Sequence, residues 1–396
     1  MPLEKSQGKG ALFSTEQNSG SALPGKRLGT EMEEQIELPK PMSATRALPR
    51  IEEGADTIRT RPCPKCYVCE RRGELLYENL TDRLFGTPGR WNLRRCPHPN
   101  CGIVWLDPMP VEEDISKAYR AYYTHEADVA PADNLARRLH SRIRMGYIRT
   151  KYRYRQDGPN RWDQLFSLLA YLDPIRRANF DFSVFYLKCK PDGRLLELGC
   201  GSGAKLKSMK ELGWQVEGVD FDPAAVGQAR ERGITAHLGT LSDQEFPDET
   251  FDAIIGIHFI EHIPDPLGML QECRRVLKPG GLLVMLTPNA GSWGHRIYRA
   301  DWRGLEPPRH LHIFTPSSLA RMCREAGLNP GLCRSTVRGS GMLLASRMLR
   351  RVARTDSTRF SAWALRLGDE MKSLAQWAAT FVGSAVGEEV LLISRK

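Results

Sequence analysis

One short segment, residues 194–203, constrains the fold more than any other part of the sequence, because an apolar run there turns into alternating glycines. The apolar residues are Leu195, Leu196 and Leu198, and the glycines are Gly199, Gly201 and Gly203. The apolar run is typical of a buried parallel strand, and residues 204–212 read as a helix that ends at Gly213. Glycine lets backbone approach a ligand closely, so strand, glycine turn and helix indicate either a nucleotide-type site or an ordinary tight turn.

The next segment favours the nucleotide-type site. Residues 215–220 read as a second strand that ends in Asp220, near the spacing of about 20 residues at which a βαβ unit places a carboxylate on ribose hydroxyls. The turn lacks the Lys-Ser/Thr of a phosphate-binding loop, and Glu197 precedes its glycines. Because an acid repels a pyrophosphate, a ligand with a cationic end suits this site better.

With these motifs the chain resembles the class I S-adenosylmethionine-dependent methyltransferases. Further matching motifs lie at residues 246–252, 265–266 and 274–281, followed by an apolar strand at 282–286. The resemblance implies an α/β fold with a Rossmann-like seven-stranded methyltransferase sheet and helices on both faces. It also implies S-adenosylmethionine as the cofactor.

The resemblance also implies which residues bind the cofactor. They are Glu197, Gly199, Cys200, Gly201, Gly203, Asp220, Phe221, Thr240 and Leu241. Glu197 and the glycine backbone would meet the methionine end, Asp220 the ribose hydroxyls, and Phe221 the adenine. The family often has an acid where Thr240 and Leu241 stand, so backbone contacts are expected to replace it here.

We expect four segments along the chain. Residues 1–60 are rich in Gly, Ser, Pro and charge, which predicts a disordered tail. Residues 61–112 form a small cysteine-bearing module, and 113–188 a basic, mostly helical linker. Residues 189–396 form the methyltransferase domain, in which 291–314 is expected to be a loop-rich insertion.

Two close pairs of cysteines in the module predict a structural zinc site, because four thiolates on turns provide a closed tetrahedral shell. The pairs are Cys66 with Cys69 and Cys96 with Cys101. Cys63 makes a second C-x-x-C with Cys66, so the ligand register stays open, as does the alternative of reduced cysteines without metal. We prefer the set of Cys66, Cys69, Cys96 and Cys101 because the chain resembles a bacterial branch of methyltransferases that has an N-terminal zinc ribbon. This branch includes sugar C-methyltransferases and is similar to the ubiquinone-pathway O-methyltransferases. That branch usually has C-x-x-C as the second pair.

The predicted catalytic residues are His258, Glu261 and His262, directly after the fourth predicted strand, where open α/β sheets bind ligands. Histidine is a natural base near neutral pH, and Glu261 would orient it or share its proton. Related methyltransferases with E-x-x-E-H here bind a divalent cation, but this chain has His258 in place of the first Glu. Two imidazoles and a carboxylate would suit zinc or another transition metal. Acid–base catalysis, metal ligation and structural hydrogen bonding all stay open.

The segment 307–314 is similar to the family's Pro-Arg-His-Leu stretch, which borders the acceptor pocket. His310 is therefore the preferred catalytic partner of His262, with His312 as a further candidate. The resemblance also suggests side chains that line or close over the pocket. They are Trp293, Trp302, Arg309, Tyr122 and Tyr123.

Net charge is +10, and much of it lies in residues 137–161. This basic stretch is expected to be a solvated connecting helix; the alternative is a surface for a phosphorylated substrate, an acidic membrane face or RNA. No apolar run is long enough to span a membrane, no signal segment is evident, and ten cysteines in this pattern fit a reducing compartment. We therefore expect a cytoplasmic protein, with peripheral membrane contact as an alternative that stays open.

The expected reaction is methyl transfer from S-adenosylmethionine to a hydroxyl or carbon of a small molecule, with anionic and nucleotide-linked molecules among the expected acceptors. A sugar or polysaccharide precursor is the first expectation for the acceptor and a lipid or quinone-like phenol the second. RNA binding or RNA modification through the zinc ribbon and basic linker is the alternative. The zinc-protease pattern H-x-x-E-H at 258–262 is disfavoured, because the motif follows a strand and Pro264 and Pro266 shorten any helix.

Overall fold

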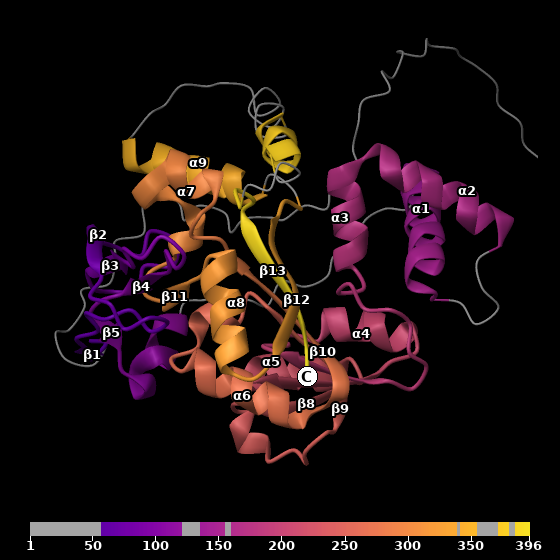
Figure 1. The fold of residues 1–396 in the computed structure, drawn as a ribbon, viewed down its shortest axis with the longest axis horizontal. Helices are drawn as coiled ribbons and strands as arrows, with labels where there is room; N and C mark the ends of the chain where they lie inside the picture. Colours follow the sequence, from indigo (N-terminus) through magenta and orange to yellow (C-terminus); the bar gives the residue numbers. More distant parts are fainter. Residues whose placement is uncertain (1–56, 121–134, 155–159, 339–340, 355–370, 380–384) are drawn as a thin grey trace, which may run out of the picture. The chain divides into compact units, whose positions relative to one another are not determined.

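The computed structural model describes residues 57–120, 135–154, 160–338, 341–354, 371–379 and 385–396. Its main feature is a seven-stranded sheet (Figure 1). The strands are β6 (Arg194–Leu198), β7 (Gln215–Asp220), β8 (Thr235–Leu238), β9 (Phe251–Ile257), β10 (Leu277–Pro288), β12 (Asn329–Thr336) and β13 (Glu389–Arg395). Their order is β12-β13-β10-β9-β6-β7-β8, with only β13 and its pairings antiparallel. The seven-stranded α/β fold is as predicted.

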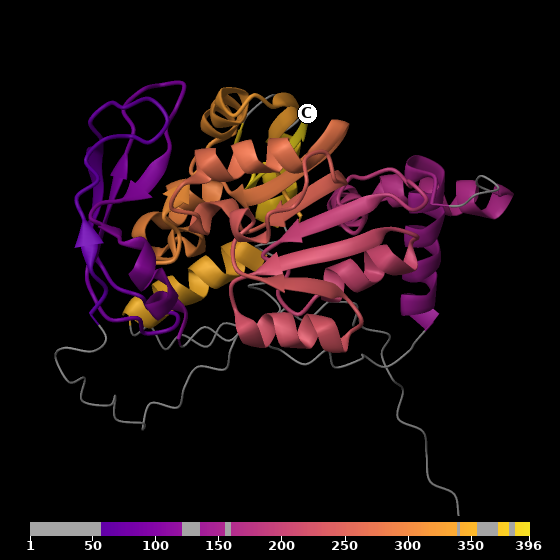
Figure 2. The same ribbon diagram turned by 90° about the horizontal axis from the view of Figure 1, so that it is seen from below.

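Helices cover both faces of this sheet (Figure 2). They are α3 (Pro174–Phe182), α4 (Ala204–Glu211), α5 (Pro223–Glu231), α6 (Pro266–Val276) and α8 (Pro316–Glu325). Alternate residues of a strand enter two different cores: Leu195 packs with the α4 and α5 side chains, and Leu196 with those of α6 and α8. Burial on both faces explains why the central strands are continuously apolar rather than alternating.

The glycine-rich turn between β6 and α4 requires its glycines. Gly199, Gly201 and Gly203 have φ of 67°, 52° and 74°, in the left-handed region that side chains rarely adopt. Gly203 also caps α4, where a Cβ atom would lie 3.0 Å from the Cβ atom of Ala229. The sequence therefore specifies this turn locally.

The cysteine-bearing module contains five short strands and a 3₁₀ helix. They are β1 (Thr60–Arg61), β2 (Glu74–Leu80), β3 (Trp91–Arg95), β4 (Val104–Leu106), β5 (Met109–Pro110) and η1 (Glu112–Tyr119). Its sheet has the order β11-β4-β3-β2, and β11 (His312–Ile313) comes from the segment that follows β10. His312 pairs with Trp105. Thus the predicted loop-rich insertion supplies a strand to the module's sheet.

The remaining described elements lie in the linker and around the insertion. The linker holds α1 (Leu135–Tyr152), α2 (Arg161–Leu169) and η2 (Ala170–Leu172). Later elements are η3 (Ser242–Gln244), η4 (Ile260–His262), α7 (Trp293–Tyr298), η5 (Arg299–Asp301), η6 (Arg303–Leu305) and α9 (Gly341–Arg354), and residues 371–379 are also helical. Within the described residues, no helix is both long and apolar enough to span a membrane.

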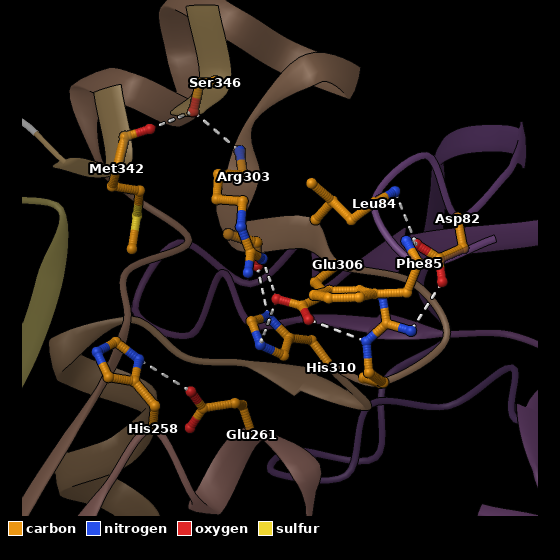
Figure 3. A network of polar contacts seen from close by, with 12 residues as sticks. Asp82, Leu84, Phe85, His258, Glu261, Arg303, Glu306, His310, Met342 and Ser346 are labelled. Atoms are coloured by element: carbon orange, nitrogen blue, oxygen red, sulfur yellow. Dashed lines mark hydrogen bonds and ion pairs between the residues drawn. The ribbon is translucent and has the colours of Figure 1, made fainter. Parts of the chain in front are cut away.

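A buried ion cluster joins the module to the segment before β11 (Figure 3). The fully buried guanidinium of Arg309 donates from Nη1 to Asp82 Oδ2 at 2.7 Å and from Nε to Glu306 Oε1 at 2.9 Å. The guanidinium also lies 4.5 Å from the ring centre of Phe85. Burial alone would raise the pKa of Asp82, but the bond from Arg309 and its charge hold that pKa below its usual value.

We expect Asp82→Ala to lower the free energy of unfolding by about 3 kcal/mol, because it leaves part of a buried cation without its partner. Asp301→Ala is the matched control: Asp301 pairs with Arg83 and Arg350, but all three side chains are partly exposed, and its loss should cost under about 1 kcal/mol. Denaturant unfolding of both variants measures the difference. Equal losses of stability would contradict the importance of the buried pair.

Candidate active site

The candidate site lies at the carboxyl ends of the central strands. The strand order reverses at β6, whose neighbours are β7 and β9, and in open α/β sheets such a switch point forms a ligand crevice. The glycine turn follows β6, Asp220 ends β7, and His258 follows β9. Residues from three separate motifs therefore meet at one edge of the sheet.

Glu197 is a buried acid whose charge is only partly compensated. Its Oε1 lies 4.0 Å from Nζ of Lys205, and its Oε2 has no hydrogen-bond partner among the described residues. Burial raises the pKa of Glu197 to about 7, and the charge of Lys205 opposes this rise only in part. A buried carboxylate oxygen without a partner is costly, so a cationic ligand group would stabilise it. This fits the ammonium group of S-adenosylmethionine.

Asp220 is oriented by two backbone groups. Its Oδ2 accepts from the Gly201 N–H at 2.8 Å and its Oδ1 from the Asp222 N–H at 3.0 Å. Burial raises the pKa of Asp220, and the two backbone bonds oppose this rise only in part. The next side chain, Phe221, is half-exposed and makes an edge-to-face contact with Tyr119, with ring centres 5.2 Å apart. Phe221 thus offers an apolar surface next to the carboxylate.

Three other residues that were predicted to bind the cofactor are Leu241, Thr240 and Cys200. Leu241 is buried, and the Thr240 N–H donates to Asp243 Oδ2 at 2.7 Å. The sequence analysis missed Asp243, because this acid stands three residues after Thr240. The bond from the Thr240 N–H holds the pKa of Asp243 below its usual value. Cys200 is buried against Gly218, where a Cβ atom would lie only 2.5 Å from the sulfur.

His258 is held between two carboxylates. Its Nδ1 lies 3.3 Å from Glu261 Oε1 and its Nε2 3.0 Å from Glu389 Oε1. Burial would lower the pKa of His258, but the two carboxylates outweigh it and raise the pKa to about 9. Arg338 binds Glu389 through two nitrogens, at 2.6 and 2.7 Å. His258 is therefore a cation at neutral pH.

Glu261 follows β9 and is fully buried, and it makes hydrogen bonds to residues at the end of β10 and just before β11. Its Oε2 accepts from the Thr287 hydroxyl at 2.9 Å, and its backbone carbonyl accepts from the Leu311 N–H at 2.7 Å. Burial would raise the pKa of Glu261, but the bond from His258 and the nearby imidazoles lower it to about 2. Its carboxylate therefore stays ionised within the histidine cluster.

His262 has a defined tautomer, inferred from its partners. Its Nδ1 lies 3.0 Å from the carbonyl oxygen of Arg309 and 2.8 Å from the Tyr119 hydroxyl. A carbonyl oxygen only accepts, so Nδ1 carries the hydrogen and Nε2 of the neutral ring holds the lone pair. This leaves Nε2 as a candidate base.

His310 lies next to His262, with ring centres 4.8 Å apart. Its Nδ1 lies 2.8 Å from the Gly304 carbonyl oxygen, so it too carries hydrogen on Nδ1. Burial lowers the pKa of His310 to about 4, which keeps the ring neutral. The structure thus brings together the two histidines that the sequence analysis paired.

The structure also gives the positions of residues that the sequence analysis assigned to the acceptor pocket or its surroundings. Trp302 is buried, with its Nε1 donating to Glu388 at 2.9 Å, and it borders a surface pocket beside Asp82. Arg309 is held in the ion cluster, and its place at an acceptor pocket stays a prediction. His312 is buried in β11 against Tyr67, with ring centres 5.3 Å apart. Tyr122 and Tyr123 lie outside the described residues.

Sequence analysis assigned no site role to three residues that contact the histidine cluster. Tyr119 comes from η1, and Glu389 and Arg338 come from the far end of the chain. Tyr119 stands three residues before Tyr122, which the resemblance suggests as a pocket residue, and this proximity is a weak signal. Glu389 and Arg338 carry no local signal, because only tertiary folding brings them to His258.

Two groups of side chains have the donor atoms for a metal. One is the predicted set Cys66, Cys69, Cys96 and Cys101, with sulfurs 3.8 Å apart between Cys66 and Cys101 and 3.2 Å between Cys69 and Cys96. Zinc–sulfur bonds of about 2.3 Å in a tetrahedron place the sulfurs about 3.8 Å apart, so the set fits zinc. Cys63 is not in the group; its carbonyl oxygen accepts from Trp105 Nε1. The other group is Glu261, His262 and His310, with donor atoms all within 4.8 Å.

Comparison with solved structures finds distant matches. A SAM-dependent methyltransferase from Archaeoglobus fulgidus is 19% identical with a TM-score of 0.39, over 57% of this chain and 94% of that chain. One from Mesorhizobium loti is 17% identical with a TM-score of 0.38, over 55% of this chain and 98% of that chain.

Sequence comparisons are more informative. A family model described as a methyltransferase domain matches residues 169–330. A ubiquinone biosynthesis O-methyltransferase from Cereibacter sphaeroides is 36% identical over 149 residues, which cover 35% of this chain and 60% of that protein. One from Xanthomonas axonopodis is 31% identical over 186 residues, which cover 43% of this chain and 76% of that protein. The chain belongs to the class I S-adenosylmethionine-dependent methyltransferases.

Proposed function

We propose that this chain transfers the methyl group of S-adenosylmethionine to a hydroxyl group of a small-molecule acceptor, with His262 as the general base. The observation that carries this proposal is the bond between His262 Nδ1 and the Arg309 carbonyl oxygen, which directs the lone pair to Nε2. This base stands on the segment after β9, at the same sheet edge as Glu197 and Asp220. A base is needed because methylation of a hydroxyl releases a proton.

The names of the relatives support an oxygen acceptor. Proteins called ubiquinone biosynthesis O-methyltransferases match this chain, and the Cereibacter protein is matched over 60% of its length. A hydroxyl on an aromatic ring is therefore the acceptor class we favour. The expectations of a sugar or polysaccharide precursor, of carbon as the acceptor, and of RNA stay predictions.

In the proposed mechanism each of the site residues has a separate role. When bound, S-adenosylmethionine supplies an electrophilic methyl group. Glu197 and Asp220 would bind and orient the cofactor. The acceptor hydroxyl would give its proton to Nε2 of His262 as its oxygen takes the methyl group. The nearby Glu261 carboxylate stabilises the imidazolium that forms, while His258 and Glu389 fix the position of Glu261.

A second role for the histidine cluster is metal ligation. Glu261 Oε1 lies 3.3 Å from His258 Nδ1, and the Nδ1 atoms of His262 and His310 face carbonyl oxygens, which directs the lone pair of each neutral ring to Nε2. One carboxylate and two imidazoles are a donor set for zinc or another transition metal. Such an ion would polarise the acceptor hydroxyl. Metal analysis of the purified chain separates this role from acid–base catalysis.

We expect His262→Gln to bind S-adenosylmethionine as well as the wild type does but to transfer methyl groups at least about 100-fold more slowly. His237→Gln is the control, since His237 pairs with Glu217 on the neighbouring strand instead. Transfer of labelled methyl is measured to a catechol, a nucleotide sugar and a structured RNA. Wild-type rates in His262→Gln would refute the base, and labelling of RNA alone would refute the acceptor class.

The pKa of Glu197 predicts a pH dependence of cofactor binding. Because burial raises this pKa to about 7, the carboxylate becomes ionised as pH rises from about 6 to about 8, and affinity for the cationic cofactor should rise with it. Without the cofactor, the same raised pKa lowers the free energy of unfolding as pH rises from about 4.5, the ordinary pKa of a glutamate, to about 7, because the unfolded chain releases this proton first.

Calorimetric titration with S-adenosylmethionine tests this dependence. Glu197→Gln should bind about tenfold or more weakly at high pH and show little change with pH, because a charge-assisted bond is lost. Glu231→Gln, at the exposed end of α5, is the matched control. Wild-type affinity that is constant with pH would contradict the role of Glu197.

We also propose that the four clustered cysteines hold one structural zinc ion. Purified protein should contain about one equivalent of zinc, Cys66→Ser should lose it and unfold more easily, and Cys63→Ser should retain it. Elemental analysis with thermal unfolding measures both effects. Loss of zinc in Cys63→Ser but not in Cys66→Ser would overturn this ligand set.

A further inference from the structure

Helix α2 is amphipathic, but its faces are reversed. The polar residues Asp163 and Ser167 are buried. The apolar residues on the other side are exposed: Trp162 by 67%, Leu165 by 49% and Leu168 by 66%. These positions repeat every three residues, and Leu172 in η2 continues the stripe with 81% exposure. A surface helix normally buries such a stripe, so this face calls for an explanation.

Specific contacts fix α2 in this orientation on α1. Gly146 of α1 allows close approach, because a Cβ atom there would lie 2.8 Å from both the Asp163 carbonyl oxygen and the Phe166 Cβ atom. The Asp163 carboxylate accepts from Arg149 at 3.3 Å and completes a capping box with Asn160. Rotating the helix to bury its leucines would break these contacts, so the exposed stripe is part of the folded structure.

The charge around the stripe is one-sided. In the described residues from 135 to 172, Asp163 is the only acid, and it is buried and paired with Arg149. Three arginines are exposed on α2 and on the helix that packs against it: Arg161 at the start of α2, and Arg138 and Arg142 on α1. A partner of this surface should therefore be apolar at its centre and anionic at its boundary.

We propose that this surface docks on a membrane that contains anionic phospholipid. The docking face consists of Trp162, Leu165, Leu168, Leu169 and Leu172, with Arg138, Arg142 and Arg161. An interfacial helix lies in the plane of the membrane with its apolar face among the acyl chains and its arginines at the headgroups. Tryptophan is favoured at that boundary. This inference is independent of the proposed reaction.

The same features argue against a second copy of the chain as the occupant. Two copies would bring basic groups of the same sign together, whereas anionic lipid would attract them. A stable protein interface also uses about 20 to 30 residues a side, many more than the docking face provides. Anionic lipid satisfies both the apolar stripe and its charge.

Vesicle flotation of the full chain tests the proposal. The wild type should float with vesicles of phosphatidylcholine and phosphatidylglycerol, float much less with phosphatidylcholine alone, and detach as salt is raised. The double variant Leu165→Asp with Leu168→Asp should reduce binding about tenfold or more. Ile297→Asp, which changes an exposed apolar residue on α7, is the matched control and should bind as the wild type does.

Two further measurements make the result decisive. The double variant Arg142→Glu with Arg161→Glu should lose the preference for anionic vesicles, while circular dichroism verifies that every variant is folded. Failure of the folded wild type to float at low salt would overturn the proposal. So would a wild-type dimer that the two aspartates convert to a monomer, because a second copy would then cover the docking face.

Discussion

The buried guanidinium of Arg309 is the interaction on which the arrangement of the site depends. It binds Asp82 of the cysteine-bearing module and Glu306 of the segment after β10, and its own carbonyl oxygen accepts from His262. One residue therefore holds the module and sets the tautomer of the candidate base. Its charge is stabilised by Glu306, three residues away, and by Asp82 of the distant module, so this cluster is complete only when the two segments come together.

Much of the fold could be predicted because its signals are local. The glycines after β6 need positive φ, the central strands are apolar on both faces, and Asp265 and Thr315 begin helices with their side chains bonded to backbone N–H groups. The clustering of Cys66, Cys69, Cys96 and Cys101 also follows from their spacing in two pairs. Each of these features depends on neighbouring residues in the sequence.

The parts of the site that could not be predicted depend on tertiary contacts. A pattern after β9 suggests that His258 is catalytic, but its charge is set by Glu389, which lies 131 residues away. The motif around Arg309 resembles a pocket border, yet Asp82 draws its side chain into the protein. Periodicity identifies α2 as amphipathic without saying that Gly146 and Asn160 turn its polar face inward. In each case the partner decides the role of the residue.

The four-stranded sheet of the module, to which β11 belongs, limits how the chain can be shortened. Because β11 pairs with β4, its backbone groups are satisfied by a module encoded some 200 residues earlier. A chain trimmed to begin at the predicted methyltransferase domain would leave β11 without its partner strand and Arg309 without Asp82. The module is therefore part of the structure that holds the histidine cluster in place, and not a separable attachment.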